Sequence, residues 1–286
     1  MRTAILGLGK MGRLLAGHVL DAGHETTVWN RTAAAADDLV ARGAHRAETP
    51  AAAAARADLV VTMLFDGPAV RSVLLDGPDP AAAGARGGTL FADVSSTGAE
   101  AARSIGAELA SRGLRFVDVP VLGSTPLAEA GTLGVTAGGS DGDLAEVMPL
   151  LLTWADPSKV FRCGPVGAGQ AMKSVVNAAM AAAGVALGEA LGLADAYGLD
   201  EAMTMDALAS SALGWTLGQK RAALTSRSFA PPTFTTGAIT KDLELLGGVS
   251  GVLAATRATA EQARAAGLGD EDYAAIIDRA RRTPAP

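Results

Sequence analysis

Short apolar runs alternate with alanine-rich amphipathic stretches through the first half of the chain. The apolar runs are rich in Val, Ile, Leu and Thr and are too short for helices, so they predict strands. They lie at residues 3–6, 26–29, 59–64, 89–93, 116–121 and 133–137. The stretches between them predict helices at residues 11–22, 33–42 and 99–112, each ending near a glycine. This alternation predicts βαβ units, that is, a mostly parallel sheet with helices on both faces.

The pattern changes near residue 160, and beyond Gly169 every periodic segment predicts a helix. We therefore predict two domains, an α/β domain over residues 1–164 and an all-helical domain over residues 165–286. Residues 168–197 predict one extended helix that leaves the first domain. The last residues, 283–286, are expected to fray.

Glycines recur every four residues along this long helix, at Gly184, Gly188 and Gly192. Small residues at that spacing let a second helix approach closely. The approaching helix could belong to the same domain or to another subunit, and the sequence leaves both interpretations open.

Composition and charge narrow the function classes. The chain carries 24 Lys+Arg against 30 Asp+Glu, a net charge of −6, and has no basic block, so nucleic acid is not an expected partner. The single Cys163 cannot form an internal disulfide, and three scattered histidines predict no metal site.

The apolar run 175–188 contains Asn177 and is shorter than the roughly 20 residues of a membrane span. We expect a cytoplasmic protein without a membrane partner.

The first predicted strand runs directly into a glycine fingerprint, Gly7-Leu8-Gly9-Lys10-Met11-Gly12, which opens the first predicted helix. Gly7 suits a tight turn, Gly9 lets the backbone approach a pyrophosphate, and Gly12 permits close packing of helix on strand. The unpaired N–H groups at the helix N-terminus would then face the phosphates. Alone, the fingerprint is also compatible with an ordinary glycine turn. The strand before it and the helix and strand after it favour a dinucleotide site.

The second predicted strand ends in Asn30-Arg31-Thr32. NAD enzymes typically place a carboxylate about 20 residues beyond the glycines, where it accepts from the ribose 2′-hydroxyl. A guanidinium at that place would instead pair with the 2′-phosphate of NADP(H). We therefore expect NADP(H) as the cofactor, with a solvated loop arginine as the alternative interpretation.

Two polar residues lie four positions apart on the long predicted helix and so share one face, Lys173 and Asn177. Because the helix is otherwise lined by Ala, Val and Met, we expect both to point into a cleft between the domains. A surface lysine and a solvated asparagine explain the pattern equally well. Lys241-Asp242 is likewise compatible with a site or with a solvated ion pair.

Further motifs follow the glycine fingerprint and Asn30-Arg31-Thr32 along the chain: Asp93-Val94-Ser95-Ser96, Asp118-Val119-Pro120-Val121, Gly131-Thr132-Leu133, Gly138-Gly139, Gly167-x-Gly169-Gln170-x-x-Lys173-x-x-x-Asn177 and Lys241-Asp242-Leu243. In these motifs and their order, the chain resembles the β-hydroxyacid dehydrogenase family over nearly its whole length. The family's glyoxylate and succinic semialdehyde reductase group is the most similar. The features that indicate this group are Gly123-Ser124 with Ala128-Glu129, Phe234 eight residues before Asp242, and Gly267-Leu268-Gly269-Asp270-x-Asp272-Tyr273.

The resemblance implies a Rossmann domain joined by a long helix to an all-α domain, with catalysis between them. It implies that Lys173 donates a proton to a carbonyl oxygen and that Asn177 holds the substrate. An ammonium beside a developing alkoxide would both stabilise its charge and supply the proton. The expected cofactor contacts are Gly7, Leu8, Gly9, Met11, Gly12, Asn30, Arg31, Thr32, Met63, Leu64, Ser96 and Lys241. The expected substrate contacts are Leu122, Gly123, Ser124, Trp215, Phe234 and Asp242.

One position departs from the family pattern. Where the family usually has Pro-Val-Ser-Gly, this chain has Pro120-Val121-Leu122-Gly123, so an isobutyl group replaces a hydroxyl that helps to bind the substrate. Loss of a hydrogen bond to a charged group weakens binding by about 1.5–3 kcal/mol. The alternative is that Ser124 or Thr125 takes over the role.

Together these features predict an NADPH-dependent reductase of an aldehyde, ketone or β-hydroxyacid-type substrate, expected to form a homodimer or a larger homo-oligomer. An imine reductase is the first alternative, because related enzymes share a strand end like residues 27–32. Those enzymes usually lack the lysine, whereas Leu122 and an apolar pocket expected from Trp215 and Phe234 favour them. A catalytically inactive dinucleotide-binding protein is the second alternative, which the joint presence of Lys173, Asn177 and Lys241 disfavours.

Overall fold

The computed structural model describes residues 1–282, so the tail expected to fray, 283–286, lies outside the described residues. The chain divides into two compact units, and the division falls between Lys173 and Ser174. This point lies inside a long helix, α9 (Ala168–Ala196), which begins shortly after the boundary predicted at residue 164.

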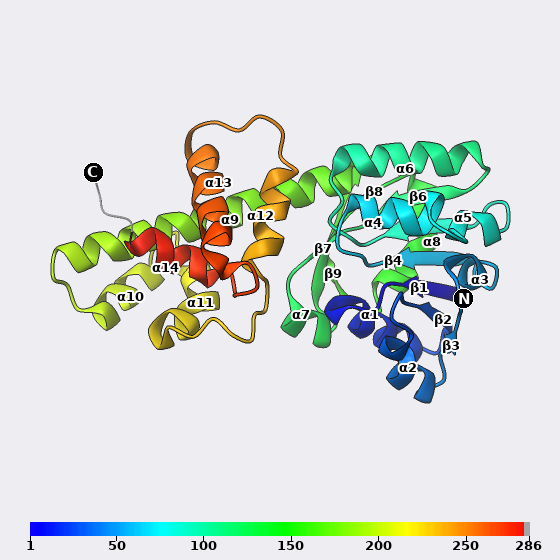
Figure 1. The fold of residues 1–286 in the computed structure, drawn as a ribbon, viewed down its shortest axis with the longest axis horizontal. Coiled ribbons are helices and arrows are strands. Elements are labelled where there is room, and N and C mark those ends of the chain that lie inside the picture. The colour runs from blue at the N-terminus through cyan, green and yellow to red at the C-terminus, as the bar shows by residue number, and fades with distance from the viewer. Residues whose placement is uncertain (283–286) are drawn as a thin grey trace. The chain divides into compact units, whose positions relative to one another are not determined.

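A sheet with helices on both faces forms the first unit (Figure 1). Its strands are β1 (Arg2–Leu6), β2 (Glu25–Trp29), β3 (His45–Arg46), β4 (Leu59–Thr62), β5 (Leu90–Asp93), β6 (Arg115–Asp118), β7 (Val121–Leu122), β8 (Leu133–Gly138) and β9 (Ala155–Gly164). Their order is β3-β2-β1-β4-β5-β6-β8-β7, with β9 also paired to β8. Strands β1 to β6 are parallel, whereas β6 and β7 pair antiparallel with β8. The order reverses between β1 and β4, which is the switch point of a Rossmann fold.

Two apolar clusters fill the first unit, one on each face of the sheet. Its helices are α1 (Lys10–Asp21), η1 (Ala33–Ala36), α2 (Asp37–Ala41), α3 (Pro50–Ala54), α4 (Gly67–Arg71), η2 (Ser72–Asp76), α5 (Ala81–Gly84), α6 (Ala99–Ser111), α7 (Thr125–Glu129) and α8 (Asp141–Leu151). Leu15 of α1 and Leu144 of α8 belong to one cluster, and Val70 of α4 and Ile105 of α6 belong to the other. The strands between them are buried on both faces, so β4 and β5 read as continuous apolar runs.

The structure has a strand at each predicted place, but it divides the predicted strand 116–121 into β6 and the start of β7, and it adds two strands that the pattern did not predict, β3 and β9. Strands β3 and β7 contain two residues each, too few to show any periodicity. Strand β9 is polar and mostly exposed, and it includes Pro157. Such a sequence suits an edge strand, but it does not resemble the buried strands from which the pattern was read.

The described residues of the second unit form helices, as predicted, together with one isolated β-bridge between Thr235 and Asp272. After α9 come α10 (Glu201–Ala209), α11 (Gly214–Ser226), α12 (Thr236–Glu244), α13 (Gly251–Ala263), η3 (Arg264–Leu268) and α14 (Ala274–Arg282). Their apolar faces meet in one cluster that includes Leu187 of α9, Leu217 of α11, Ile239 of α12 and Ile277 of α14.

The three glycines of α9 pack against α14 within the same unit. A Cβ added to Gly188 would lie 2.2 Å from the backbone oxygen of Ile277, and one on Gly192 would lie 2.5 Å from that of Arg281. The glycine stripe is therefore an intrachain packing surface. Among the described helices, α9 alone has the length and hydropathy of a membrane span, and this packing accounts for part of its apolar character.

Replacing Gly188 with alanine should destabilise the helical unit by about 1–3 kcal/mol, because the new methyl group meets the backbone of α14. Gly218 of α11 has no atom within 4 Å of its would-be Cβ and provides the matched control. Gly218→Ala should stabilise the unit by up to ~1 kcal/mol through helix propensity. Thermal or urea unfolding measures the stability of both variants. A Gly188→Ala protein as stable as wild type would contradict the close packing of α9 on α14.

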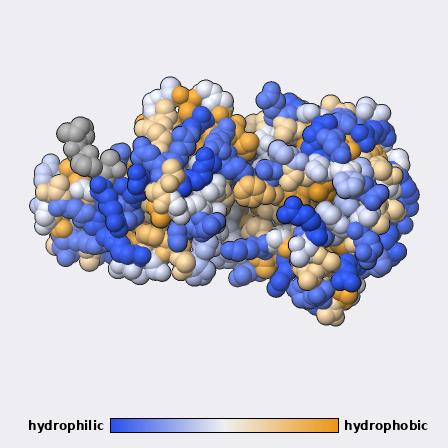
Figure 2. Space-filling model, in the orientation of Figure 1, coloured by the Kyte–Doolittle hydropathy of each residue, from blue (hydrophilic) through white to orange (hydrophobic). Residues whose placement is uncertain are grey.

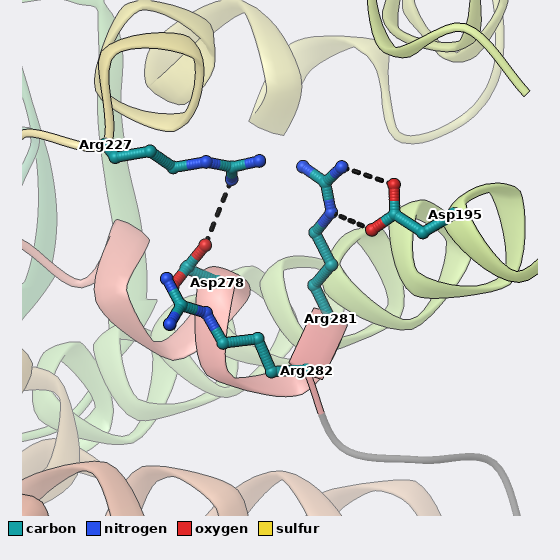
Figure 3. A pocket seen from close by; sticks show the side chains of 5 residues that line it. All are labelled: Asp195, Arg227, Asp278, Arg281 and Arg282. Carbon is teal, nitrogen blue, oxygen red and sulfur yellow. Dashed lines mark hydrogen bonds and ion pairs between the residues drawn. The ribbon is translucent and has the colours of Figure 1, made fainter. Parts of the chain in front are cut away.

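One pocket of the helical unit, of about 300 Å³, is lined by charged side chains, Asp195, Arg227, Asp278, Arg281 and Arg282 (Figure 3). Two nitrogens of Arg281 donate to the two carboxylate oxygens of Asp195. Asp278 makes ion pairs with Arg227 and Arg282, with nitrogen–oxygen distances of 3.0 and 2.7 Å. The hydrogen bond from Arg281 lowers the pKa of Asp195. Each of the three arginines therefore already has a carboxylate partner, and these ion pairs hold the ends of the helices together.

The face of the molecule seen in Figure 2 is mostly hydrophilic, with scattered hydrophobic residues.

Candidate cofactor and substrate site

Sterics explain two of the three glycines in the turn between β1 and α1. Gly7 has a φ of +103°, and a Cβ there would lie 2.4 Å from the carbonyl oxygen of Met63. A Cβ on Gly12 would lie 2.0 Å from the carbonyl oxygen of Gly7. Gly9 differs, because no atom lies within 4 Å of its would-be Cβ. It is the N-cap of α1 and no side chain caps that helix, so backbone N–H groups are presented at an open surface that fits a pyrophosphate.

Asn30 links this turn to the end of β2. Its side-chain oxygen accepts from the N–H of Leu8 at 3.0 Å, and its side-chain nitrogen donates to the carbonyl of Thr32 at 3.0 Å. The amide is thus used to shape two loops that follow neighbouring strands. The loop after β1 borders the switch point between β1 and β4, where a dinucleotide binds in this kind of sheet.

Arg31 is exposed at the end of β2 and makes no hydrogen bond or ion pair with any residue in the described range 1–282. The next two acidic residues after Arg31 in the sequence already make ion pairs with other arginines. Asp37 lies 3.1 Å from Arg46, and Asp38 lies 3.2 Å from Arg13. The guanidinium of Arg31 is therefore available to an anionic ligand.

The loops after β4 and β5 are joined to each other. The N–H of Leu64 donates to the hydroxyl of Ser95 at 2.9 Å. Met63 and Leu64 are partly buried against the two apolar clusters of the sheet, whereas the next residue, Phe65, is 66% exposed. Met63 and Leu64, which are expected cofactor contacts, therefore lie on a loop that is held beside the glycine turn.

Asp93 ends β5 and organises the loop that contains Ser96. Its carboxylate accepts from the hydroxyl of Thr62 at 2.8 Å, the N–H of Ser95 at 3.1 Å and the hydroxyl of Thr97 at 3.2 Å. Burial raises the pKa of this carboxyl, and these hydrogen bonds oppose the increase. The carboxylate holds the loop from the side of the sheet.

Asp118 ends β6 and holds the beginning of α9. Its two oxygens accept from the N–H groups of Gly167 at 2.6 Å and Gln170 at 2.8 Å. Thr136 of β8 donates its hydroxyl to the carbonyl of Gly169 at 2.9 Å. Burial raises the pKa of Asp118 to about 6, although the hydrogen bonds from Gly167 and Gln170 lower it. The long helix therefore starts from a fixed point at the carboxyl end of β6.

Lys173 and Asn177 are both buried on α9, with exposed fractions of 8% and 4%. Asn177 donates its side-chain N–H to one oxygen of Asp242 at 2.5 Å. Lys241 makes an ion pair with the other oxygen at 3.0 Å. That oxygen is buried and accepts no hydrogen bond of normal geometry from a described residue. The structure thus brings Asn177, Lys241 and Asp242 together, and it excludes the solvated pair as the explanation of Lys241-Asp242.

Leu122 lies on the face of the sheet on which α9 begins. It pairs with Gly134 of β8, and directly opposed residues of an antiparallel pair point to the same face. Thr136, two residues further along β8, shares that face and bonds to α9. Gly123 follows with a φ of +126°, and Ser124 is the N-cap of α7 with its hydroxyl not used for capping. The side chain of Leu122 is partly exposed there.

The two expected aromatic contacts lie in different surroundings. Phe234 packs edge-on against Tyr273 with ring centroids 6.4 Å apart, and the ammonium of Lys220 lies 4.4 Å from the centroid of Tyr273. Trp215, on the first turn of α11, is 67% exposed. The apolar pocket expected from Trp215 and Phe234 stays a prediction.

Sequence reasoning placed Asp93, Asp118 and Gln170 in motifs but assigned no role to their side chains. Both aspartates are the last residue of a parallel strand, a place where functional side chains gather, and this signal could have revealed them. Gln170 shares one helix face with Lys173 and Asn177, at positions i, i+3 and i+7. This spacing of three polar residues on an apolar helix can be read from the sequence and could have revealed Gln170.

Comparison with known proteins gives matches over nearly the whole chain. Residues 2–164 match the family model for the NAD binding domain of 6-phosphogluconate dehydrogenase. Residues 167–280 match the model described as NAD-binding of NADP-dependent 3-hydroxyisobutyrate dehydrogenase. Glyoxylate/succinic semialdehyde reductase 1 of Arabidopsis thaliana is 33% identical, over 97% of this chain and 98% of that protein.

Solved structures show the same architecture. The 3-hydroxyisobutyrate dehydrogenase of Mycobacterium tuberculosis, solved with L-serine, has a TM-score of 0.86 and 30% identity, covering 96% of this chain and 97% of its own. An imine reductase from Myxococcus stipitatus, solved with NAD+, has a TM-score of 0.68 and 21% identity, over 97% of this chain and 98% of its own. At that identity the likeness concerns the fold alone.

Proposed function

The chain belongs to the β-hydroxyacid dehydrogenase family of oxidoreductases, and from this premise we propose that it is an NADPH-dependent reductase of small carbonyl acids. The proposed substrates are aldehyde or keto acids such as glyoxylate and succinic semialdehyde, and the reverse reaction oxidises the corresponding hydroxy acid. The observation that carries this proposal is a buried lysine, Lys173, on a helix bonded to the dinucleotide-binding sheet. Buried lysines are usually paired, as Lys220 is with Asp272. What supports a role for Lys173 is its place on α9, three residues after the turn that Asp118 holds at the carboxyl end of β6.

Three features support NADP(H) as the cofactor. The N-terminus of α1 is open at Gly9 and suits the pyrophosphate. Arg31 is exposed without an ionic partner among the described residues, as expected of a group that pairs with a 2′-phosphate. Asn30 and Thr32 share its loop, and Asn30 fixes that loop against the glycine turn.

When bound, the reduced nicotinamide supplies a hydride to the carbonyl carbon of the substrate. We assign to Lys173 the transfer of a proton to the carbonyl oxygen, where its ammonium also stabilises the developing negative charge. We assign to Asn177 the orientation of the substrate, and to Asp242, which accepts from the side-chain N–H of Asn177 and pairs with Lys241, the positioning of these two residues. Lys241 neutralises the charge of that carboxylate.

Leu122 should determine which carbonyl compounds are preferred. Leu122→Ser restores a hydroxyl to the face of the sheet on which α9 begins, so kcat/KM for glyoxylate or succinic semialdehyde should rise by roughly 10-fold, the size of one hydrogen bond to a charged group. For a bulkier apolar ketone, kcat/KM should fall because apolar contact area is lost. Leu152→Ser, at an exposed position after α8, is the control and should change neither value.

Steady-state kinetics with both substrate types measures this crossover. If both values of kcat/KM move in the same direction in Leu122→Ser, residue 122 does not face the substrate and the proposed specificity is wrong.

An imine reductase is the second candidate function, and the apolar side chain of Leu122 favours it. A screen of NADPH oxidation over short semialdehydes, bulky ketones and cyclic imines distinguishes the candidates. We expect turnover of the semialdehydes. Turnover of cyclic imines alone would make the protein an imine reductase, and no turnover in any class would indicate a binding protein without catalytic activity.

We also propose that the enzyme assembles as a homodimer or a larger homo-oligomer and acts in the cytoplasm. Exposed apolar side chains on the helical unit, at Leu193, Tyr197, Leu199 and Met203, support self-association. The single cysteine fits a reducing compartment. Light scattering after gel filtration measures the subunit number.

A further inference from the structure

The amide side chain of Gln170 joins helix α9 to the loop after β5. Its nitrogen donates to the carbonyl of Ser95 at 2.7 Å. Its oxygen accepts from the N–H groups of Thr97 at 3.1 Å and Gly98 at 3.3 Å. The orientation of the amide is settled by these partners, because a carbonyl can only accept and a backbone N–H can only donate. We call these three hydrogen bonds the Gln170 clamp.

The clamp is buried, since Gln170 is 1% exposed. It holds residues 95–98 from the side of α9, while Asp93 holds the same loop from the side of the sheet through the N–H of Ser95 and the hydroxyl of Thr97. The loop between them has little freedom to move. Ser96, which the family resemblance implies as a cofactor contact, lies in this loop.

Gln170 lies three residues before Lys173, so the two side chains share one face of α9 in consecutive turns. The backbone of the same turn is fixed by Asp118, which accepts from the N–H of Gln170. One residue therefore connects three parts: the strand end at β6, the loop after β5, and the turn that carries the lysine.

We propose that Gln170 is a positioning residue for the reduction, which sets Lys173 at a fixed distance from the loop after β5. This inference rests on the proposed function, because it assumes that Lys173 delivers the proton. Displacement of a catalytic group by about 1 Å can lower a rate by roughly 10²-fold, so a buried clamp next to the lysine has a kinetic effect beyond stability. Gln170 itself need touch neither substrate nor cofactor.

Two substitutions separate positioning from simple stabilisation. Gln170→Met keeps the approximate side-chain volume but removes all three hydrogen bonds. Gln170→Glu can still accept from Thr97 and Gly98, and its second carboxyl oxygen donates to the carbonyl of Ser95 only when the carboxyl is protonated, so the ionised form lacks that one hydrogen bond. Gln219→Met, at an exposed position on α11, is the matched control.

In Gln170→Met we expect kcat to fall by roughly 10- to 100-fold, while the KM for the carbonyl substrate and the dissociation constant of NADPH change far less. Gln170→Glu should recover part of kcat, and Gln219→Met should equal wild type. Hydrogen exchange should show that the amides of Thr97 and Gly98 lose protection in Gln170→Met and keep it in Gln170→Glu. This readout needs no turnover.

Wild-type kcat in a folded Gln170→Met enzyme would overturn the proposal, as would amides of Thr97 and Gly98 that keep their protection in that variant. A fall in NADPH affinity as large as the fall in kcat would make Gln170 a cofactor-site residue and would also overturn it. If Gln170→Met does not fold, the pH profile of Gln170→Glu decides: kcat equal to wild type at a pH at which the carboxyl is ionised, and so cannot donate to Ser95, contradicts the proposal. Failure of the wild-type enzyme to reduce any carbonyl would instead refute the proposed function, and the inference with it.

Discussion

Replacing Lys173 with alanine is expected to lower the rate of the reduction step by roughly 10²- to 10⁴-fold, the usual contribution of a positioned general acid. The methyl group of alanine can neither give a proton to the carbonyl oxygen nor stabilise its negative charge. NADPH affinity should stay nearly constant, because the expected phosphate contacts lie on the glycine turn and at Arg31. Single-turnover kinetics and calorimetric titration measure the two quantities separately.

A suitable control is Lys159→Ala, which removes an exposed lysine from β9 and should leave both quantities unchanged. If NADPH binding by Lys173→Ala weakens as much as turnover does, Lys173 is a cofactor or structural contact. The assignment of the proton donor would then be wrong, whatever the substrate.

Arg31→Asp is expected to reverse the cofactor preference. The wild-type protein should bind NADPH at least ~10-fold more tightly than NADH, a difference of about 1.4 kcal/mol. The new carboxylate would repel the 2′-phosphate of NADPH and accept from the 2′-hydroxyl of NADH. The change acts at one exposed side chain with no ionic partner in residues 1–282, so the fold should be unaffected.

Titration of both proteins with NADPH and NADH measures the four affinities. Arg56→Ala, a change at another exposed arginine of the first unit, controls for the general loss of positive charge and should keep the wild-type preference. Equal affinities of the wild-type protein for NADPH and NADH would refute the role of Arg31.

Local patterns in the sequence were sufficient to predict most of the fold. Parallel strands buried on both faces read as unbroken apolar runs, and the glycine turn after β1 requires residues without a Cβ at positions that the sequence shows directly. Strand β9 was missed because an exposed edge strand carries charged residues and a proline, which resemble a loop. The partner of the α9 glycines also needed the structure, since spacing cannot tell an intrachain helix from a second subunit.

The sequence predicted individual residues of the candidate site but not the contacts between them. Lys173, Asn177, Lys241 and Asp242 were identified by motif, yet only the structure pairs Asn177 with Asp242. The three hydrogen bonds of the Gln170 clamp join residues more than 70 positions apart in sequence, which no local pattern encodes. Long-range contacts of this kind depend on tertiary packing, and for that reason sequence reasoning left the side chain of Gln170 without a role.

The most direct test of the proposed function follows deuterium from the cofactor to the product. Wild-type protein would be incubated with succinic semialdehyde and NADPH that carries deuterium at both C4 positions, and the product analysed by mass spectrometry. We expect the hydroxy acid with one deuterium on the carbon that was the aldehyde, formed in equal amount to NADP+. NADP+ formation without the deuterated hydroxy acid, or no reaction with this substrate while a cyclic imine is reduced, would contradict a carbonyl reductase.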